Sequence, residues 1–279
     1  MSAKAIPSSG EIRTAPAPGG GNLEYEVIGT GEPLVLLHGA FTGRSAWSRQ
    51  RVLAAERRLI VPSSRAHDGS ERRLPPDYGV ATSDVADLAS VVDALGLDRF
   101  DLVGHSSGGA TAFAYACRFP EKVQRLVLIE PTLLALLPAA AMQEMQSEWG
   151  RLIEVARSEG DGPGLAATIS WLGRDAWRQL PADRREKALA AMKGVAHVAG
   201  PHLRALLDLA VTPDDVRSLP HTALLVYGAA SFPFEELLAR RLMELRPDWT
   251  LLTVPNAGHN CFRDAPDLVN AAIREHIGA

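Results

Sequence analysis

Residues 104–109 read Gly-His-Ser-Ser-Gly-Gly and contain the pattern G-x-S-x-G around Ser106. A short apolar run at 100–103 precedes the pattern, and a segment with the character of a helix, 107–119, follows it. A strand that turns sharply into a helix holds its serine exposed at the crest of the turn, beside the helix N-terminus. The spacing therefore predicts nucleophilic catalysis by Ser106.

A serine hydroxyl is a weak nucleophile and needs a general base. Among the eight histidines, His259 follows Ser106 in chain order and stands in a loop between a predicted strand at 250–254 and a predicted helix at 265–277. This is the position that the G-x-S-x-G arrangement requires of its base. Four other histidines lie before the serine, beside it, or in a segment without a zinc-binding spacing: His38, His105, His197 and His202. We therefore predict that His259 is the base.

The elements that position these side chains follow an alternating pattern. Apolar strands alternate with helices of 10 to 15 residues, which predicts an α/β fold with a parallel sheet covered on both faces. The predicted strands are 22–28, 34–37, 59–61, 100–103, 123–129, 224–227 and 250–254, and the predicted helices are 44–57, 83–95, 107–119, 234–246 and 265–277.

The alternation stops after Pro131, and residues 132–218 carry helical patterns without a convincing strand. We interpret this segment as a helical insertion that covers the crevice at the carboxyl edge of the sheet. The core is then 22–131 together with 219–279. Residues 1–21 are expected to form an N-terminal tail, within which 11–15 has the pattern of a first edge strand.

Composition excludes several classes of protein. The net charge of −4 is spread along the chain and no basic tract occurs, so we expect no nucleic-acid partner. The longest apolar stretch, 133–142, is far shorter than the roughly 20 residues that span a bilayer. Two isolated cysteines and no signal-peptide pattern predict a cytoplasmic protein. No metal-ligating or dinucleotide motif occurs, so no cofactor is expected.

Three segments together resemble the α/β-hydrolases over residues 22–279. They are Leu36-Leu37-His38-Gly39-Ala40, the 104–109 turn, and Gly258-His259 with Asp264-Ala265-Pro266 behind it. The resemblance implies an eight-stranded, mostly parallel sheet with a helical cap inserted after the sixth strand. It also assigns the oxyanion hole to the backbone N–H groups of Ala40 and Ser107. Arg65, His67 and Ser70 match a family loop whose implied role is to brace the fold.

The acidic residue that is expected to orient His259 departs from the family pattern. Family members usually place an aspartate three residues after the glycine that ends the seventh strand, and here that position is Ser231. Glu130, at the end of the sixth strand, occupies the alternative position, so we predict that it orients His259. Glu235 and Glu236 remain competing candidates. With Glu130-Pro131-Thr132, the 106–108 segment and 228–231, the chain resembles the fungal zearalenone lactonase group.

These features predict a serine hydrolase that cleaves an ester or lactone bond of a hydrophobic small molecule. The expected pocket residues are His38, Phe41, Leu133, Leu134, Trp171 and Trp177. Two alternatives stay open: hydrolysis of a carbon–carbon bond in a diketone, and a non-hydrolytic cyclase or ligand receptor built on the same scaffold. We expect a monomer or a homodimer.

Overall fold

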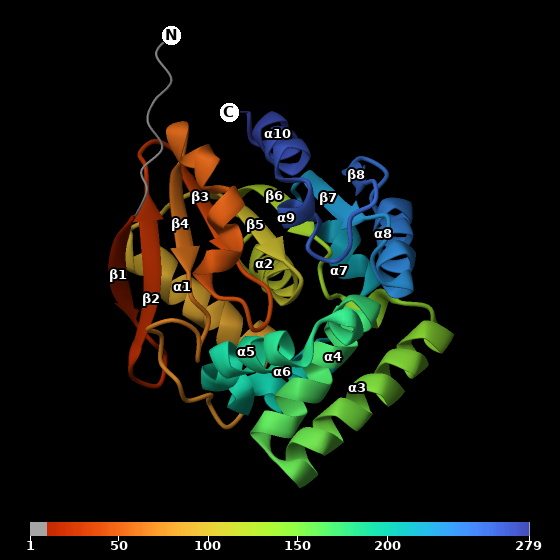
Figure 1. The fold of residues 1–279 in the computed structure, drawn as a ribbon. Helices are drawn as coiled ribbons and strands as arrows, with labels where there is room; N and C mark the ends of the chain where they lie inside the picture. Colours follow the sequence, from red (N-terminus) through yellow and green to blue (C-terminus); the bar gives the residue numbers. More distant parts are fainter. Residues whose placement is uncertain (1–9, 279) are drawn as a thin grey trace.

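An eight-stranded sheet forms the centre of the protein in the computed structural model, which describes residues 10–278 (Figure 1). The strands run in the order β1-β2-β4-β3-β5-β6-β7-β8. Their bounds are β1 Glu11–Pro16, β2 Asn22–Ile28, β3 Pro33–Leu37, β4 Arg58–Pro62, β5 Phe100–His105, β6 Val123–Ile129, β7 Ala223–Gly228 and β8 Thr250–Val254. The strands from β4 to β8 in this order pair in parallel, whereas β1 and β2 are antiparallel. The predicted α/β fold with a mostly parallel sheet is confirmed.

The central strands are almost wholly apolar because helices cover both faces of the sheet. All six residues of β5 are buried, and four of the five in β3. The tail predicted over 1–21 is in part a strand, since β1 pairs with β2 along its whole length. Residues 1–9 of that tail lie outside the described residues.

Helices on one face of the sheet pack into a single apolar cluster with it. They are α1 Val85–Ala94, α2 Ser107–Arg118 and α8 Pro233–Leu245. The opposite face is covered by η1 Arg44–Arg49, η2 Arg51–Ala55, α9 Cys261–Asp264 and α10 Pro266–Ile277. The helix predicted over 44–57 is thus two 3₁₀ turns. They meet at Gln50, whose buried amide donates to the carbonyl of Phe262 and so ties the junction to α9.

The segment between β6 and β7 is helical, and most of it lies together at one end of the sheet (Figure 1). It contains η4 Leu134–Leu136, α3 Ala139–Glu159, α4 Asp161–Gln179, α5 Ala182–Met192, η5 Lys193–Val198, α6 Ala199–Leu207 and α7 Pro213–Ser218. Helix α7 begins at a capping box formed by Thr212 and Asp215. Within residues 10–278, no helix has the length and apolarity needed to cross a bilayer.

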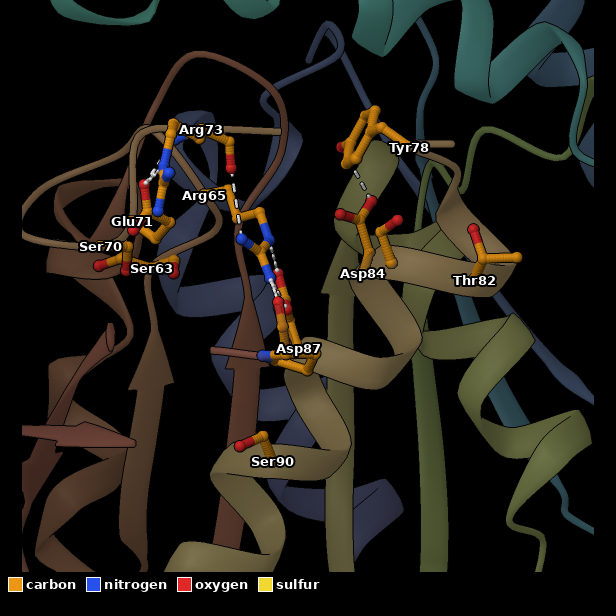
Figure 2. A network of polar contacts seen from close by, with 12 residues as sticks. Ser63, Arg65, Ser70, Glu71, Arg73, Tyr78, Thr82, Asp84, Asp87 and Ser90 are labelled. Carbon is orange, nitrogen blue, oxygen red and sulfur yellow. Dashed lines mark hydrogen bonds and ion pairs between the residues drawn. The ribbon is translucent and has the colours of Figure 1, made fainter. Parts of the chain in front are cut away.

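The loop after β4 is held by a buried ion pair, as the sequence resemblance implies. Arg65 donates two hydrogen bonds of 2.8 Å to the Asp87 carboxylate on α1, and Figure 2 shows the two side chains end to end. A third bond of 2.7 Å reaches the carbonyl of Pro18. The arginine thereby joins the loop, α1 and the segment after β1.

Candidate active site

Ser106 lies at a tight turn between β5 and α2, in a backbone conformation that residues other than glycine rarely adopt. Its φ is 55° and its ψ is −120°. The turn is possible because its neighbours lack side chains: a Cβ on Gly104 would lie 2.2 Å from the Gly108 carbonyl oxygen, and one on Gly108 would lie 2.4 Å from that of Leu37. The predicted strand–turn–helix context is therefore present, with Ser106 at its crest.

A continuous chain of hydrogen bonds joins Ser106, His259 and Glu130. Nε2 of His259 lies 3.0 Å from Ser106 Oγ, and Nδ1 of the same ring lies 2.5 Å from Glu130 Oε2. The serine comes from the β5–α2 turn, the histidine from the loop between β8 and α9, and the glutamate from the end of β6. The three residues meet because parallel strands end at one edge of the sheet. This geometry is that of a nucleophile, its base and an orienting acid.

Glu130 is completely buried and its two carboxylate oxygens accept hydrogen bonds from three groups. The backbone N–H of Gly228 donates to Oε1 at 2.7 Å, and the hydroxyl of Ser231 donates to Oε2 at 2.6 Å. His259 Nδ1 is the third partner. These donors offset the free energy that the carboxylate loses when it is removed from water. Without such hydrogen bonds, a buried carboxylate would not remain ionised. The position where the family usually has its acid thus supplies a hydrogen-bond donor instead.

The two competing acids lie in very different surroundings. Glu236 is exposed and pairs with Arg240 on the surface of α8. Glu235 is buried, and its Oε1 lies 3.6 Å from His259 Nδ1, farther than Glu130. Burial, followed by the charge of Glu130, raises the pKa of Glu235 well above its ordinary value. These surroundings favour the neutral, protonated form of Glu235 beside the histidine.

Glu130, Glu235 and His259 are also a group of side chains that could hold a metal ion, since one ligand atom from each lies within 4.8 Å of the others. Sequence inspection missed this group because its members are more than 20 residues apart along the chain. The hydrogen bonds favour a nucleophile, base and orienting acid over a metal site. Nδ1 of His259 is directed at Glu130, and both oxygens of that carboxylate already accept hydrogen bonds.

The backbone around Ser106 leaves two N–H groups available. Within the described part of the chain, the N–H groups of Ala40 and Ser107 donate to no other residue. Gly39 brings the Ala40 segment close to the serine, because a Cβ on Gly39 would lie 3.1 Å from Ser106 Cβ. The Ser107 N–H begins helix α2, where the helix dipole favours negative charge. The oxyanion hole proposed from sequence is compatible with this arrangement.

Two adjoining pockets meet at Ser106 and His259. One, of about 390 Å³, is lined by Phe41 and Trp171 together with Trp149, Phe232, Leu203 and others. The second, of about 770 Å³, is lined by Phe41, Trp177, Ile169 and Leu172 among others. Three of the residues predicted to form the pocket, Phe41, Trp171 and Trp177, line one or both of these pockets. Sequence reasoning missed Thr132, whose hydroxyl lies 3.5 Å from Ser106 Oγ.

Three other predicted pocket residues line neither of these pockets. Leu133 and Leu134 are fully buried in the apolar cluster beneath the insertion. His38 is buried, with Nδ1 at 2.8 Å from the Gly39 carbonyl oxygen and Nε2 accepting from the Ser64 N–H at 3.1 Å. Burial lowers the pKa of His38 to about 3, so the ring is a neutral brace between two loops.

Comparison with known proteins identifies the family. The model of the alpha/beta hydrolase family matches residues 34–272, so this chain belongs to that family. The 2-hydroxy-6-oxo-2,4-heptadienoate hydrolase of Pseudomonas putida is 31% identical over 227 residues, which are 75% of this chain and 76% of that protein.

Solved structures of the same fold include an esterase and an enol-lactonase. A thermophilic esterase from Thermogutta terrifontis is 28% identical, with a TM-score of 0.74 over 95% of this chain and 97% of its own. An enol-lactonase from Burkholderia xenovorans is 21% identical, with a TM-score of 0.74 over 96% of this chain and all of its own, and at that identity the likeness concerns the fold alone. The alpha/beta hydrolase assignment made from sequence is confirmed.

Proposed function

We propose that the protein is a serine hydrolase that cleaves an ester or lactone bond of an uncharged, hydrophobic small molecule. The main support for this proposal is the chain of hydrogen bonds that runs from Ser106 Oγ through His259 to Glu130, which is completely buried. A buried carboxylate held by two further donors keeps the imidazole in one orientation, which a general base requires.

The reaction follows from this geometry. His259 Nε2 takes the Ser106 hydroxyl proton as Oγ attacks the acyl carbon, and the carbonyl oxygen becomes an oxyanion held by the N–H groups of Ala40 and Ser107. The imidazolium, stabilised by Glu130, returns the proton to the leaving alkoxide. Water then gives a proton to His259 and attacks the acyl-enzyme, and the serine regains its proton as the carboxylic acid leaves.

The lining of the two pockets supports a neutral, apolar substrate. It is dominated by aromatic and aliphatic side chains, and no lysine or arginine is among the described residues that line either pocket. Trp149, Trp171, Leu172 and Leu203 come from the helical insertion. We accordingly propose that residues 132–218 act as a cap that shapes the pocket and excludes water. A lactone is a specific candidate, because the placement of the acid at Glu130 resembles the zearalenone lactonase group.

Carbon–carbon bond hydrolysis is the second candidate, and the relative from Pseudomonas putida favours it. The substrate in the name of that relative is a carboxylate, which needs a cationic partner when it is bound away from water. Such a partner is missing from the described lining of the Ser106 pockets, which instead includes the acid Glu235. We therefore rank ester or lactone hydrolysis first.

A labelling experiment combined with a substrate panel tests both the proposed nucleophile and the proposed substrate class. A fluorophosphonate is expected to modify Ser106 alone, and Ser106→Ala is expected to abolish both labelling and turnover. An adduct mapped to any other residue would refute the nucleophile. The panel contains p-nitrophenyl esters, macrocyclic and small lactones, and a 2-hydroxy-6-oxo-dienoate. Turnover of the dienoate in preference to esters and lactones would establish the second candidate instead.

The proposed cellular compartment rests on the state of the two cysteines. Cys117 and Cys261 are both free thiols, which suits a reducing compartment such as the cytoplasm. The proposed state of assembly is a monomer or a homodimer.

A further inference from the structure

His202 is a buried histidine that stands between two cavities. It belongs to α6 and lines the pocket of about 390 Å³ that contains Ser106. It also lines a cavity of about 500 Å³ beside the start of α2, together with Asp84, Asp87 and Ser107. The ring of Phe41, which lines the Ser106 pocket, lies 6.1 Å from the His202 ring. His202 is thus a polar group in a pocket wall made mostly of aromatic and aliphatic side chains, in addition to the polar groups at the Ser106 end of the pocket.

Within the described part of the chain, one of the two ring nitrogens of His202 has a hydrogen-bond partner and the other has none. Nδ1 lies 3.0 Å from the hydroxyl of Tyr78, and that hydroxyl lies 3.2 Å from Asp84 Oδ2, as Figure 2 shows for the latter pair. Nε2 is buried and has no hydrogen-bond partner among residues 10–278. The two nitrogens of an imidazole point in diverging directions, so Nε2 is directed away from Tyr78. A buried polar atom without a partner is costly, which makes a bound ligand the expected partner.

The His202 ring is uncharged at neutral pH. Burial, and then the neighbouring His67, lower the pKa of His202 to about 4. The two histidines on the facing loops, His67 and His38, also have lowered pKa values because they are buried. A neutral imidazole carries one proton, on Nδ1 or on Nε2. The hydrogen bonds on the Nδ1 side therefore decide whether Nε2 donates or accepts.

Tyr78 has a single hydroxyl proton, and Asp84 determines where that proton is directed. When Asp84 is ionised, Tyr78 donates to the carboxylate and accepts from Nδ1–H of His202, which leaves Nε2 as an acceptor. When Asp84 is protonated, it donates to the Tyr78 oxygen, and Tyr78 donates to Nδ1. Nε2 then carries the ring proton and is a donor.

The groups around Asp84 set the pH at which it gains or loses its proton, and this pH is close to neutral. Burial, and then the charge of Asp87 on α1, the helix that begins directly after Asp84, raise the pKa of Asp84 to about 7. The hydrogen bond from Tyr78 and the positive charge of Arg65 act in the opposite direction, but they are smaller influences. Figure 2 shows that the Arg65 guanidinium is directed at Asp87 and not at Asp84. Among the described residues, no lysine or arginine forms an ion pair with Asp84.

We propose that Nε2 of His202 is a specificity-determining subsite that binds a hydroxyl or carbonyl oxygen of the substrate, away from the bond that is cleaved. Tyr78 and Asp84 are positioning residues that set its polarity: it donates when Asp84 is protonated and accepts when Asp84 is ionised. A carbonyl oxygen, which only accepts, binds in the first state alone, whereas a hydroxyl group binds in both. This inference rests on the proposed ester hydrolysis at Ser106.

The test uses three p-nitrophenyl esters that differ at one carbon: heptanoate, 6-oxoheptanoate and 6-hydroxyheptanoate. At pH 6 we expect kcat/KM for the oxo ester to exceed that for heptanoate by about 10-fold, as for one buried hydrogen bond. At pH 8 this advantage is expected to disappear, while the advantage of the hydroxy ester persists. His202→Phe is expected to reduce both ratios to about 1. Tyr78→Phe is expected to remove the change of the oxo ratio between pH 6 and pH 8.

The matched control is His197→Phe, because His197 is also in the insertion but lines neither of the two Ser106 pockets. It is expected to leave all ratios as in the wild type. Ratios that survive in an active His202→Phe enzyme would overturn the proposal. A second measurement tests the subsite even if the protein hydrolyses no ester. Calorimetry with Ser106→Ala compares the binding affinities of methyl 6-oxoheptanoate and methyl heptanoate at pH 6. Equal affinity for the two compounds would overturn the subsite independently.

Discussion

The hydroxyl of Ser231 donates a hydrogen bond of 2.6 Å to Glu130 Oε2, the same oxygen that accepts from His259 Nδ1. Ser231 thus lies within one hydrogen bond of the carboxylate that orients the base. Its backbone position, three residues after the end of β7, is the one at which other members of the family carry the acid. The residues at the end of β7 and just after it therefore converge on the carboxylate of Glu130 at the end of β6.

Replacing Glu130 and Glu235 separately distinguishes the orienting acid from its neutral neighbour. Glu130→Gln removes the charge that stabilises the imidazolium and is expected to reduce kcat by about 10²–10⁴-fold. Glu235→Gln keeps an uncharged side chain of the same shape and is expected to change kcat by less than about 5-fold. Steady-state kinetics on one ester measures both, with Glu236→Gln as the exposed control. A larger loss in Glu235→Gln than in Glu130→Gln would reverse the assignment.

The Ser231 contact allows the acid to be moved from one strand end to the other. Ser231→Ala removes one donor to a buried carboxylate and is expected to lower kcat about 10-fold. Ser231→Asp in the Glu130→Gln background is expected to recover part of the activity, because the new carboxylate starts within hydrogen-bond reach of the same site. Ser158→Ala, on the exposed end of α3, is the control. A double variant no faster than Glu130→Gln would show that the two positions are not equivalent.

Glu235 is expected to make the stability of the protein depend on pH. Its pKa is higher in the folded protein than the ordinary value of 4.5, so its contribution is complete below pH 4.5 and is lost as pH rises toward the folded pKa. Relative to wild type, Glu235→Gln should therefore gain stability with rising pH, at no more than about 1.4 kcal/mol per pH unit. Denaturant unfolding at pH 4.5, 6 and 8 measures this. A constant difference between the two proteins would contradict a buried, neutral Glu235.

Leu133 and Trp171 were both expected in the pocket, but only Trp171 lies there. Leu133→Ala is expected to lower the free energy of unfolding by about 2–5 kcal/mol, because the side chain is completely buried. Trp171→Ala is expected to change the preference for acyl chain length more than stability, since its ring is only partly buried and stacks at 4.9 Å on Phe232 in the pocket wall. Chemical unfolding and a panel of p-nitrophenyl esters separate the two effects. A change of selectivity in Leu133→Ala without loss of stability would be inconsistent with its buried position.

The sequence by itself determined the features that depend on neighbouring residues. The turn at Ser106 needs glycines at 104 and 108, and a strand before it and a helix after it, all within about 20 residues. The alternation of strands and helices likewise reflects local periodicity, and it is enough to predict a parallel sheet. His259 and Glu130 were predictable because, in a parallel sheet, residues just after the strands are brought to the same edge.

Only the tertiary structure decided how side chains far apart in the chain pack against one another. Leu133 and Trp171 are both apolar, and their types do not reveal which one faces a cavity and which one faces the core. The same is true of His202, whose role depends on Tyr78, 124 residues away along the chain. Burial raises or lowers a pKa according to the whole surroundings of a group, and those surroundings exist only after folding. For that reason the neutral state of Glu235 and the raised pKa of Asp84 could not be predicted from the residues alone.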